Sequence, residues 1–408
     1  MGMHSVVVTG IGLVTPLGLT AEEHRSRVCT MESGIGGLPA FAEGNRGCHA
    51  TARVAEFDFT ESLRFPKSTK FMNRPVLCGM KAALEAYRSA GLAGAGLDDE
   101  RLGVFAGSGN TCLEPDYFTG ALDLAWADGK ERDYKYLGGR PSRMIDRYFS
   151  LRTLSNGGVG LLSIEIGAKG PGANFVHGET ASLMALQSAW YDIGEGRCDV
   201  ALAGGYDCLV QPTTFLDFQV KGQLSKAEPA CAYRPFDVNR DGLVPGEGGA
   251  FLVLEAREHA EKRRARILAE ILAVDCRMSS EGEIAAELLD GRRPDFAVLR
   301  GLGTVEDDRA EYESVQGVLE SVPSTALKSR TGYLGAGTAA AEFVLGLLAA
   351  REGLVPAVAR LQKPDSECSL DLVMNEARPL ARGTSTGLFL SSSLAGQAGG
   401  IVARVMEA

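Results

Sequence analysis

Ten short apolar runs recur along the chain, and they constrain its fold more than any other feature of the sequence. Most of them lack the alternation of apolar and polar residues that marks a half-exposed strand. Runs of this type are typical of strands that are buried on both faces, in sheets covered by helices. We therefore predict strands at residues 5–9, 103–106, 173–176, 200–203, 250–254, 269–274, 296–299, 325–328, 387–391 and 401–405.

Three further segments are predicted to form helices, at residues 76–89, 181–194 and 339–351. The second and third are rich in small and apolar residues, which suits helices buried between layers. After the first predicted strand the chain passes Gly10, Gly12 and Gly18. This glycine-punctuated stretch predicts an exit loop.

The composition is that of a soluble globular protein with a large core. The chain has 408 residues, of which 45% are hydrophobic and 23% are charged. A net charge of −10 argues against nucleic-acid binding. Nine cysteines without a CxxC pair argue against metal sites and a disulfide framework. Because the sequence shows neither a leader pattern nor an uncharged apolar run of about 18 residues, we expect no membrane span and a cytoplasmic location.

One long motif points to a known family. The segment 235–248, Pro-Phe-Asp-Val-Asn-Arg-Asp-Gly-Leu-Val-Pro-Gly-Glu-Gly, resembles the PFD-x-x-RDG-x-V-x-GEG signature of β-ketoacyl synthases. Gly204-Gly205, the Lys-Ser pair at 328–329 and Asn-Glu-Ala-Arg at 375–378 follow the same family pattern. These matches span nearly the whole chain.

The resemblance implies a fold as well as a family. It implies an α/β, thiolase-type five-layer αβαβα fold built from two similar halves, each with a five-stranded mixed sheet. We place the halves at residues 1–257 and 258–408, divided at a charged segment. No low-complexity linker separates them, so we do not expect independently mobile domains.

In the family, a cysteine at the start of a helix accepts the acyl chain, because unpaired backbone N–H groups and the helix dipole lower a thiol's pKa there. The matching position in this chain is Glu179. A carboxylate cannot form the acyl thioester through which a condensing enzyme receives its chain. The resemblance therefore implies a subunit without the family's nucleophile.

Two catalytic histidines of the family are also replaced. The first matches Arg300 and the second matches Tyr333, and no histidine follows His259. A guanidinium stays protonated and cannot shuttle a proton, while a phenol with a pKa of about 10 is poorly matched to proton transfer at neutral pH. Lys328 alone is retained from the catalytic set, and we expect it to be a structural cation paired with a carboxylate.

Four interpretations of Glu179 follow from its position. It could mimic the charge of a loaded site or hold a water, or it could accept hydrogen bonds from backbone N–H groups at a helix N-terminus. It could form an acid–base couple with His177. It could also be the counter-ion of Arg300, since a buried carboxylate needs a partner.

The replaced residues resemble those of chain-length factors, which pair with an active ketosynthase in type II polyketide systems and commonly carry glutamine at the cysteine position. We therefore expect a catalytically inactive subunit that forms a heterodimer with an active ketosynthase and shapes its acyl tunnel. By the resemblance, the partners are that ketosynthase and an acyl carrier protein. No cofactor is expected in this chain, because the partner subunit would bind the phosphopantetheine-linked acyl chain.

The resemblance also suggests which residues close the tunnel. A stretch after the strand at 103–106 supplies the candidates Cys112, Leu113, Asp116 and Thr119. An ordinary interface helix is the competing interpretation of this stretch. Lys262, Arg263, Arg264 and Arg266 form a compact basic segment that could dock an acidic carrier protein or be a solvated helix face.

Two alternative functions stay open from the sequence. Glu179 could promote decarboxylation of malonyl carrier protein to prime a pathway, with Arg300 stabilising the developing charge. The chain could instead be a non-catalytic homodimer that holds a carrier-linked acyl chain.

Overall fold

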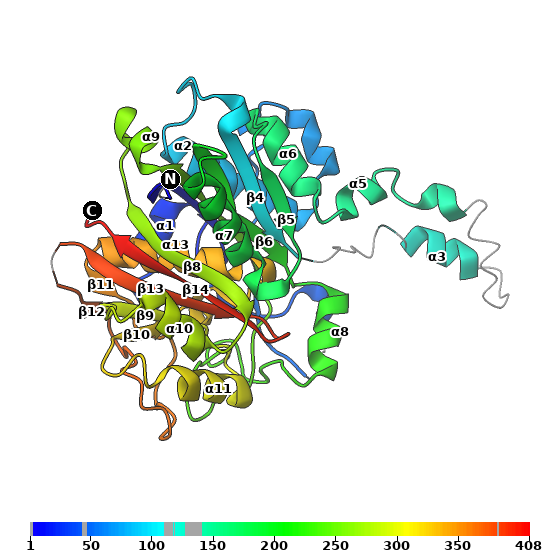
Figure 1. The fold of residues 1–408 in the computed structure, drawn as a ribbon. Coiled ribbons are helices and arrows are strands. Elements are labelled where there is room, and N and C mark those ends of the chain that lie inside the picture. Colours follow the sequence, from blue (N-terminus) through cyan, green and yellow to red (C-terminus); the bar gives the residue numbers. More distant parts are fainter. Residues whose placement is uncertain (1–2, 43–46, 110–116, 118, 127–140, 382) are drawn as a thin grey trace.

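The computed structural model describes residues 3–42, 47–109, 117, 119–126, 141–381 and 383–408 (Figure 1). Within these residues a ten-stranded mixed sheet forms the framework, in the order β10-β9-β13-β14-β8-β1-β7-β6-β4-β5. Each of the ten predicted runs overlaps one of its strands. The strands are β1 (Val6–Val14), β4 (Leu102–Ser108), β5 (Gly172–Phe175), β6 (Val200–Cys208), β7 (Glu247–Ala256), β8 (Ala269–Met278), β9 (Phe296–Leu299), β10 (Ser324–Ala326), β13 (Ser385–Ser392) and β14 (Gln397–Val405).

The sheet consists of two sets of five strands with the same arrangement. In the first set β5, β4 and β6 are parallel, and β7 and β1 follow antiparallel. In the second set β10, β9 and β13 are parallel, and β14 and β8 follow antiparallel. The sets meet where three residue pairs join β1 to β8. Two similar halves with mixed five-stranded sheets are thus confirmed, while the boundary after residue 257 stays a prediction.

Two central helices separate the two sets of strands (Figure 1). They are α7 (Ala181–Gly194) and α13 (Thr338–Arg351), and every residue of α13 is buried. Leu186 and Phe343 of these helices share one apolar cluster with Leu252 of β7 and Phe389 of β13. Burial against strands of both halves explains why these two sequences are rich in small and apolar residues.

Other helices cover the outer faces of the sheet. Helices α2 (Arg74–Ser89) and α6 (Gly157–Ile166) pack on the first set of strands, and α10 (Glu281–Leu289) and α11 (Val305–Val315) pack on the second. The resulting order of layers is α-β-α-β-α, which is the thiolase-type fold that the family resemblance implies.

Shorter elements connect the layers. They are α1 (Ala21–Arg27), β2 (Ile35–Gly36), η1 (Ala40–Ala42), β3 (Thr51–Ala52), η2 (Thr60–Ser62), η3 (Pro66–Phe71), η4 (Asp99–Arg101), α3 (Thr119–Trp126), η6 (Pro141–Met144), α5 (Phe149–Thr153), η7 (Gly178–Thr180), α8 (Pro212–Val220), α9 (Arg257–Lys262), α12 (Lys328–Thr331), η8 (Gly335–Gly337), β11 (Leu354–Val355) and β12 (Arg378–Pro379).

The exit loop predicted after residue 9 is wrong, because β1 continues through Gly10 and Gly12 to Val14. Both glycines allow helix α2 to approach the strand closely. A Cβ atom at Gly10 would lie 2.3 Å from the carbonyl oxygen of Ala86, and one at Gly12 would lie 1.9 Å from that of Ala82. Here glycine permits helix–strand packing rather than a turn.

The prediction of a strand at residues 325–328 extends two residues too far at its C-terminal end. Strand β10 stops at Ala326, and Lys328 opens the short helix α12. The backbone turns at Leu327, which has helical dihedral angles. This turn places the ammonium of Lys328 in the interior, where it meets two carboxylates, as described below.

The signature motif holds loops together. Arg240 is 5% exposed, and its guanidinium donates a 2.8 Å hydrogen bond to Asp365 and further hydrogen bonds to backbone carbonyls. Glu247 accepts from the guanidinium of Arg74 and from the backbone N–H of Val54. The charges of Arg240 and Glu247 are therefore held by structural contacts.

Among the described residues, no helix is both long and apolar enough to cross a membrane. In the same part of the chain, no group of three or more His, Cys, Asp or Glu side chains is placed to hold a metal ion.

The contact between β1 and α2 can be tested by the substitution Gly12→Ala. We expect it to lower the free energy of unfolding by about 1–3 kcal/mol, because the added methyl group would overlap the backbone of Ala82. The measurement is the denaturant dependence of unfolding of the purified full chain, followed by circular dichroism.

Gly36→Ala is the matched control, because a Cβ atom at Gly36 meets no atom within 4 Å. We expect this variant to unfold like the wild type, within about 0.5 kcal/mol. Equal stability of both variants would contradict the close approach of β1 and α2.

Candidate functional site

Four charged side chains meet in the interior of the protein. Glu179 lies in η7, shortly after β5; Arg300 follows β9 directly; Lys328 opens α12 after β10; and Glu342 lies in the central helix α13. Their exposed fractions are 0%, 4%, 0% and 3% in that order. We call these four residues the buried charge cluster.

Lys328 lies between the two carboxylates of the cluster. Its ammonium is 2.8 Å from Glu179 Oε1 and 2.9 Å from Glu342 Oε2. It also donates a 2.6 Å hydrogen bond to the carbonyl oxygen of Arg300. Burial by itself would lower the pKa of Lys328, but the charges of Glu179 and Glu342 outweigh it and raise the pKa. Lys328 therefore stays protonated, as a buried structural cation whose first counter-ion is Glu179, while Glu342 adds a negative charge only as it ionises.

Arg300 neutralises the other oxygen of Glu179. Its Nε donates to Glu179 Oε2 at 3.3 Å, and its Nη1 donates to Asp307 Oδ1 at 3.3 Å. Two buried backbone N–H groups, those of Arg300 and Gly301, donate to Glu311. These contacts hold both the backbone and the guanidinium of Arg300 in place.

Of the interpretations of Glu179, the one in which it is the counter-ion of Arg300 agrees with the structure. No backbone N–H group in the described part of the chain donates to this carboxylate, so it does not act as a helix cap. Its two oxygens face two different cations. The carboxylate is held in place by opposite charges.

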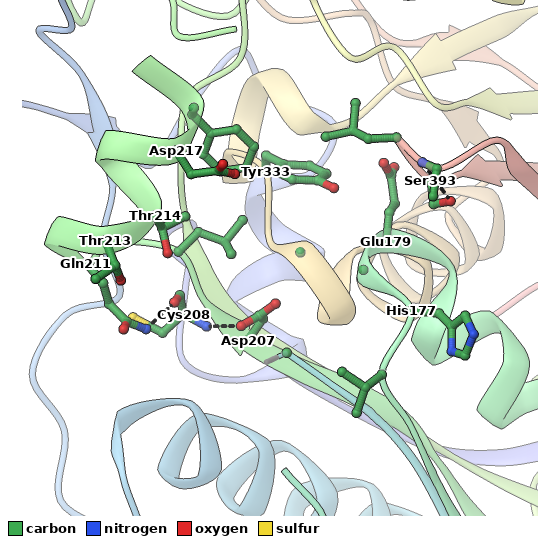
Figure 2. Close-up of a pocket in the computed structure, with 18 of the residues that line it drawn as sticks. His177, Glu179, Asp207, Cys208, Gln211, Thr213, Thr214, Asp217, Tyr333 and Ser393 are labelled. Carbon is green, nitrogen blue, oxygen red and sulfur yellow. Dashed lines mark hydrogen bonds between the residues drawn. The ribbon is translucent and has the colours of Figure 1, made fainter. Parts of the chain in front are cut away.

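The acid–base couple of His177 and Glu179 is wrong. Strand β5 ends at Phe175, and Gly178 has a φ of 57°, so the side-chain alternation of the strand does not reach Glu179. The two side chains point in different directions (Figure 2). His177 is exposed, whereas Glu179 is fully buried.

Tyr333, which the family resemblance matches to the second histidine, lies beside the cluster. It is 4% exposed, and its ring packs edge-on against Phe218, with 6.1 Å between the ring centroids. Burial, and after it the charge of Glu179, raises the pKa of Tyr333 well above its ordinary value. The phenol therefore stays protonated at neutral pH and does not act there as a general base in its phenolate form.

A pocket of about 450 Å³ opens above these residues. Its walls come from the segment before α7, from α8, and from the turn between β13 and β14 (Figure 2). Tyr333 and the fully buried Glu179 lie at its inner end, and Asp217 and Lys221 lie on α8. By the family resemblance, we expect Glu179 and Tyr333 at this inner end to occupy the positions of the family's cysteine and second histidine.

The chemistry available at this inner end is limited. Glu179 cannot form a thioester, Arg300 cannot release a proton, and Tyr333 keeps its proton. Cys208 also lines the pocket, and its thiol lies 3.3 Å from Glu247. The charged groups of this region are thus stabilised by one another.

Sequence reasoning missed the acidic residues that complete the site. Glu342 is the only acidic residue in the otherwise apolar first two turns of α13, a signal that could have revealed it. Burial raises its pKa to about 8, against the opposing charge of Lys328. Burial also raises the pKa of Glu311 to about 8. The positions of Asp307 and Glu311 in the sequence did not indicate that these residues contact residue 300.

The predicted tunnel residues cannot be placed. Cys112, Leu113 and Asp116 lie outside the described residues, and Thr119 opens α3 with a side chain that the structure does not describe. Their role stays a prediction.

The basic segment is partly structural. Arg263 donates to the buried carboxylate of Glu255 at 2.6 and 2.7 Å, whereas Lys262, Arg264 and Arg266 are exposed. The segment therefore presents three charges to solvent rather than four.

The raised pKa of Glu342 predicts how stability depends on pH. The folded protein keeps this carboxyl group protonated up to about pH 8, whereas it ionises near 4.5 in the unfolded chain. The folded state therefore binds more protons between these values, and stability falls as the pH rises through this window. We expect Glu342→Gln to reduce that fall by up to about 1.4 kcal/mol per pH unit, measured by thermal unfolding between pH 5.5 and pH 8.

Glu61→Gln serves as its control, since Glu61 is an exposed acid outside the cluster. We expect this variant to follow the wild-type pH dependence. Parallel curves for wild type and Glu342→Gln would refute a protonated Glu342.

Comparisons with known proteins agree with this architecture. The family model described as "Beta-ketoacyl synthase, N-terminal domain" matches residues 3–260. The tetracenomycin polyketide synthase ketoacyl synthase beta subunit of Streptomyces glaucescens is 30% identical, over 98% of both chains. The alpha subunit from the same organism is 29% identical, over 98% of this chain and 97% of its own length. A 3-oxoacyl-acyl-carrier-protein synthase 2 from Synechocystis is 29% identical, over 92% of both chains.

Solved structures show the same fold. A structure of the ishigamide ketosynthase/chain length factor has a TM-score of 0.84 at 24% identity, with 99% of both chains covered. A chain in a structure of a type II polyketide synthase acyl carrier protein in complex with its ketosynthase has a TM-score of 0.83 at 25% identity. The match covers 99% of this chain and 100% of that chain. With its signature motif, its layered fold and these matches, the chain belongs to the β-ketoacyl synthase family, on a thiolase-type fold.

Proposed function

We propose that this chain is a catalytically inactive chain-length factor. In this proposal it pairs with an active ketosynthase in type II polyketide biosynthesis and shapes the acyl tunnel of its partner. The observation that carries the proposal is the buried ion pair of Glu179 with Lys328 and Arg300, at the position where the family accepts its acyl chain.

The loss of catalysis is supported by Glu179 and Arg300 in combination, and not by either replacement alone. A lone Glu179 could be a general base, but its oxygens lie 2.8 and 3.3 Å from two cations. If the Glu179 carboxylate left these cations, Lys328 and Arg300 would be buried without it, which is unfavourable in free energy in a low-dielectric interior. The carboxylate is therefore a poor nucleophile and a poor base in this environment.

Exposed apolar side chains support a partner subunit. Met144, Leu151, Leu154 and Ile164 are 53%, 50%, 53% and 61% exposed, and they lie on or next to η6, α5 and α6. In Figure 1, α3 and α5 project from the body of the molecule. Strand β5 is also an edge strand of the sheet. Apolar patches and open strand edges of this kind are typical of protein interfaces.

Similarity to both subunits of one relative fits such a pairing, since the identities to the alpha and beta subunits of the tetracenomycin ketoacyl synthase are 29% and 30%. We assign the acyl carrier protein to the complex as a second partner. Because the carrier is acidic by the family resemblance and this chain has a net charge of −10, its main docking face would belong to the ketosynthase.

No phosphopantetheine-bound acyl group is expected to transfer onto this chain. Glu179 offers a carboxylate where a thiol would be needed, and His177, whose imidazole lines the pocket, is exposed and points away from Glu179 (Figure 2). The phosphopantetheine-linked chain would instead be bound by the partner.

Covalent loading tests the loss of catalysis. With radiolabelled acyl carrier protein and the reconstituted pair, we expect label on the ketosynthase and none on this chain. When the partner's catalytic cysteine is replaced by alanine, we expect no product, even if this chain carries Glu179→Cys, because Arg300 and Tyr333 cannot replace the histidines.

Glu179→Gln in this chain, beside an intact partner, is the matched control for that assay and should sustain product formation. Label on the wild-type chain, or product from the pair that lacks the partner's cysteine, would refute an inactive subunit.

Product analysis tests the tunnel. When the pair is expressed with its other synthase components, we expect Thr119→Trp to shorten the main product by at least one extension unit, because a larger side chain would fill the tunnel end. Thr384→Trp, at an exposed position before β13, should leave the product unchanged. Unchanged product length in both variants would count against a tunnel role for residue 119.

The same purified proteins can distinguish the two alternative functions from the proposed one. Release of carbon dioxide from malonyl carrier protein by the isolated chain, lost in Glu179→Ala, would support decarboxylation. A stable homodimer that binds acyl carrier protein without a ketosynthase would support the acyl-binding alternative. Both ion pairs of Glu179 weigh against the first, since decarboxylation would need Arg300 free to stabilise developing charge.

A further inference from the structure

A second cavity of about 450 Å³ lies at the other end of helix α13. It is lined by β1, α1, the segment before β8 and the last turn of α13. The buried charge cluster contacts the beginning of this helix, and the cavity contacts Arg351 at its end. At 1.5 Å per residue the helix is about 20 Å long, so the two sites are separate.

Three arginines from different elements line this cavity: Arg25 on α1, Arg266 before β8 and Arg351 on α13. Two acidic residues also line it, and both pair with Arg25. The guanidinium of Arg25 lies 2.6 Å from Glu22 and 3.0 Å from Glu352. Among the described residues, Arg266 and Arg351 form no ion pair with a carboxylate, so two of the three guanidinium groups of the cavity have no counter-ion in direct contact.

Arg351 is the buried member of this set. It is 7% exposed, and its Nη1 donates to the carbonyl oxygens of Leu268 and Met406 at 3.2 and 2.9 Å. Burial, and after it the charge of Arg266, lowers the pKa of Arg351. The guanidinium is thus held rigidly by backbone carbonyls beside a second cation, and an anion in the cavity would relieve that repulsion.

Other walls of the cavity are apolar. Ile11, Leu268 and Leu348 line it, and the hydroxyl group of Ser89 is bonded to the backbone of Ile11. Ala408 also lines it, and its backbone N–H donates to the carbonyl oxygen of Arg351. A volume of this size is in the range of small-molecule sites. The combination favours a ligand with an apolar body and one anionic group.

We propose that this cavity binds a small organic carboxylate with a short apolar chain. The carboxylate pairs with Arg266 and Arg351, and the apolar chain lies along Ile11, Leu268 and Leu348. Nothing in this proposal depends on catalysis or on the tunnel of a partner subunit.

Isothermal titration of the full chain with octanoate tests the site. We expect saturable binding, with octanol and inorganic phosphate binding at least about tenfold more weakly, because each supplies only one half of the recognised chemistry. Arg266→Ala removes an exposed cation and should weaken octanoate binding by about tenfold or more. Ala21→Leu narrows the cavity without changing its charge and should also weaken binding.

Lys262→Ala is the control, because Lys262 is an exposed cation near Arg266 in the chain but does not line the cavity. It should bind octanoate like the wild type. Thermal unfolding without ligand verifies that each variant is folded. Absence of saturable binding would overturn the proposal, as would octanoate binding that survives both Arg266→Ala and Ala21→Leu, since it would then belong to another site.

Discussion

The ammonium of Lys328 is the contact on which the centre of this molecule depends. It has no exposed surface, and it joins Glu179 at the start of α7, Glu342 in α13 and the carbonyl oxygen of Arg300 after β9. A buried cation without partners is strongly destabilising, so these segments must keep their relative positions. One side chain thereby connects both central helices with the second set of strands.

Glu179 and Arg300 are best understood as a pair. A glutamate alone at the buried cysteine position, or an arginine alone at the buried histidine position, would place an uncompensated charge in the core. Together they lie 3.3 Å apart, and Lys328 and Asp307 complete their neutralisation. In the proposed function, these fixed charges stand where the family has neutral reactive groups, so the shape of the site is kept without its nucleophile.

The signature motif of the family persists for a different reason. Arg240 and Glu247 bind Asp365, Arg74 and backbone groups, so the motif stabilises loops rather than carrying out chemistry. Such a motif identifies the fold even where the reacting groups have changed, and function must be argued from the site itself.

The sequence by itself determined the ten strands and the helices at 76–89, 181–194 and 339–351, because apolar runs are local signals. Tertiary structure decided the rest. Gly10 and Gly12 serve packing against α2 rather than a turn, because a distant helix contacts them. Glu179 pairs with Arg300 and Lys328, and not with His177, because partners more than one hundred residues away surround it once both halves have folded. Charge neutralisation in a buried site depends on distances in space, which the order of residues along the chain does not contain.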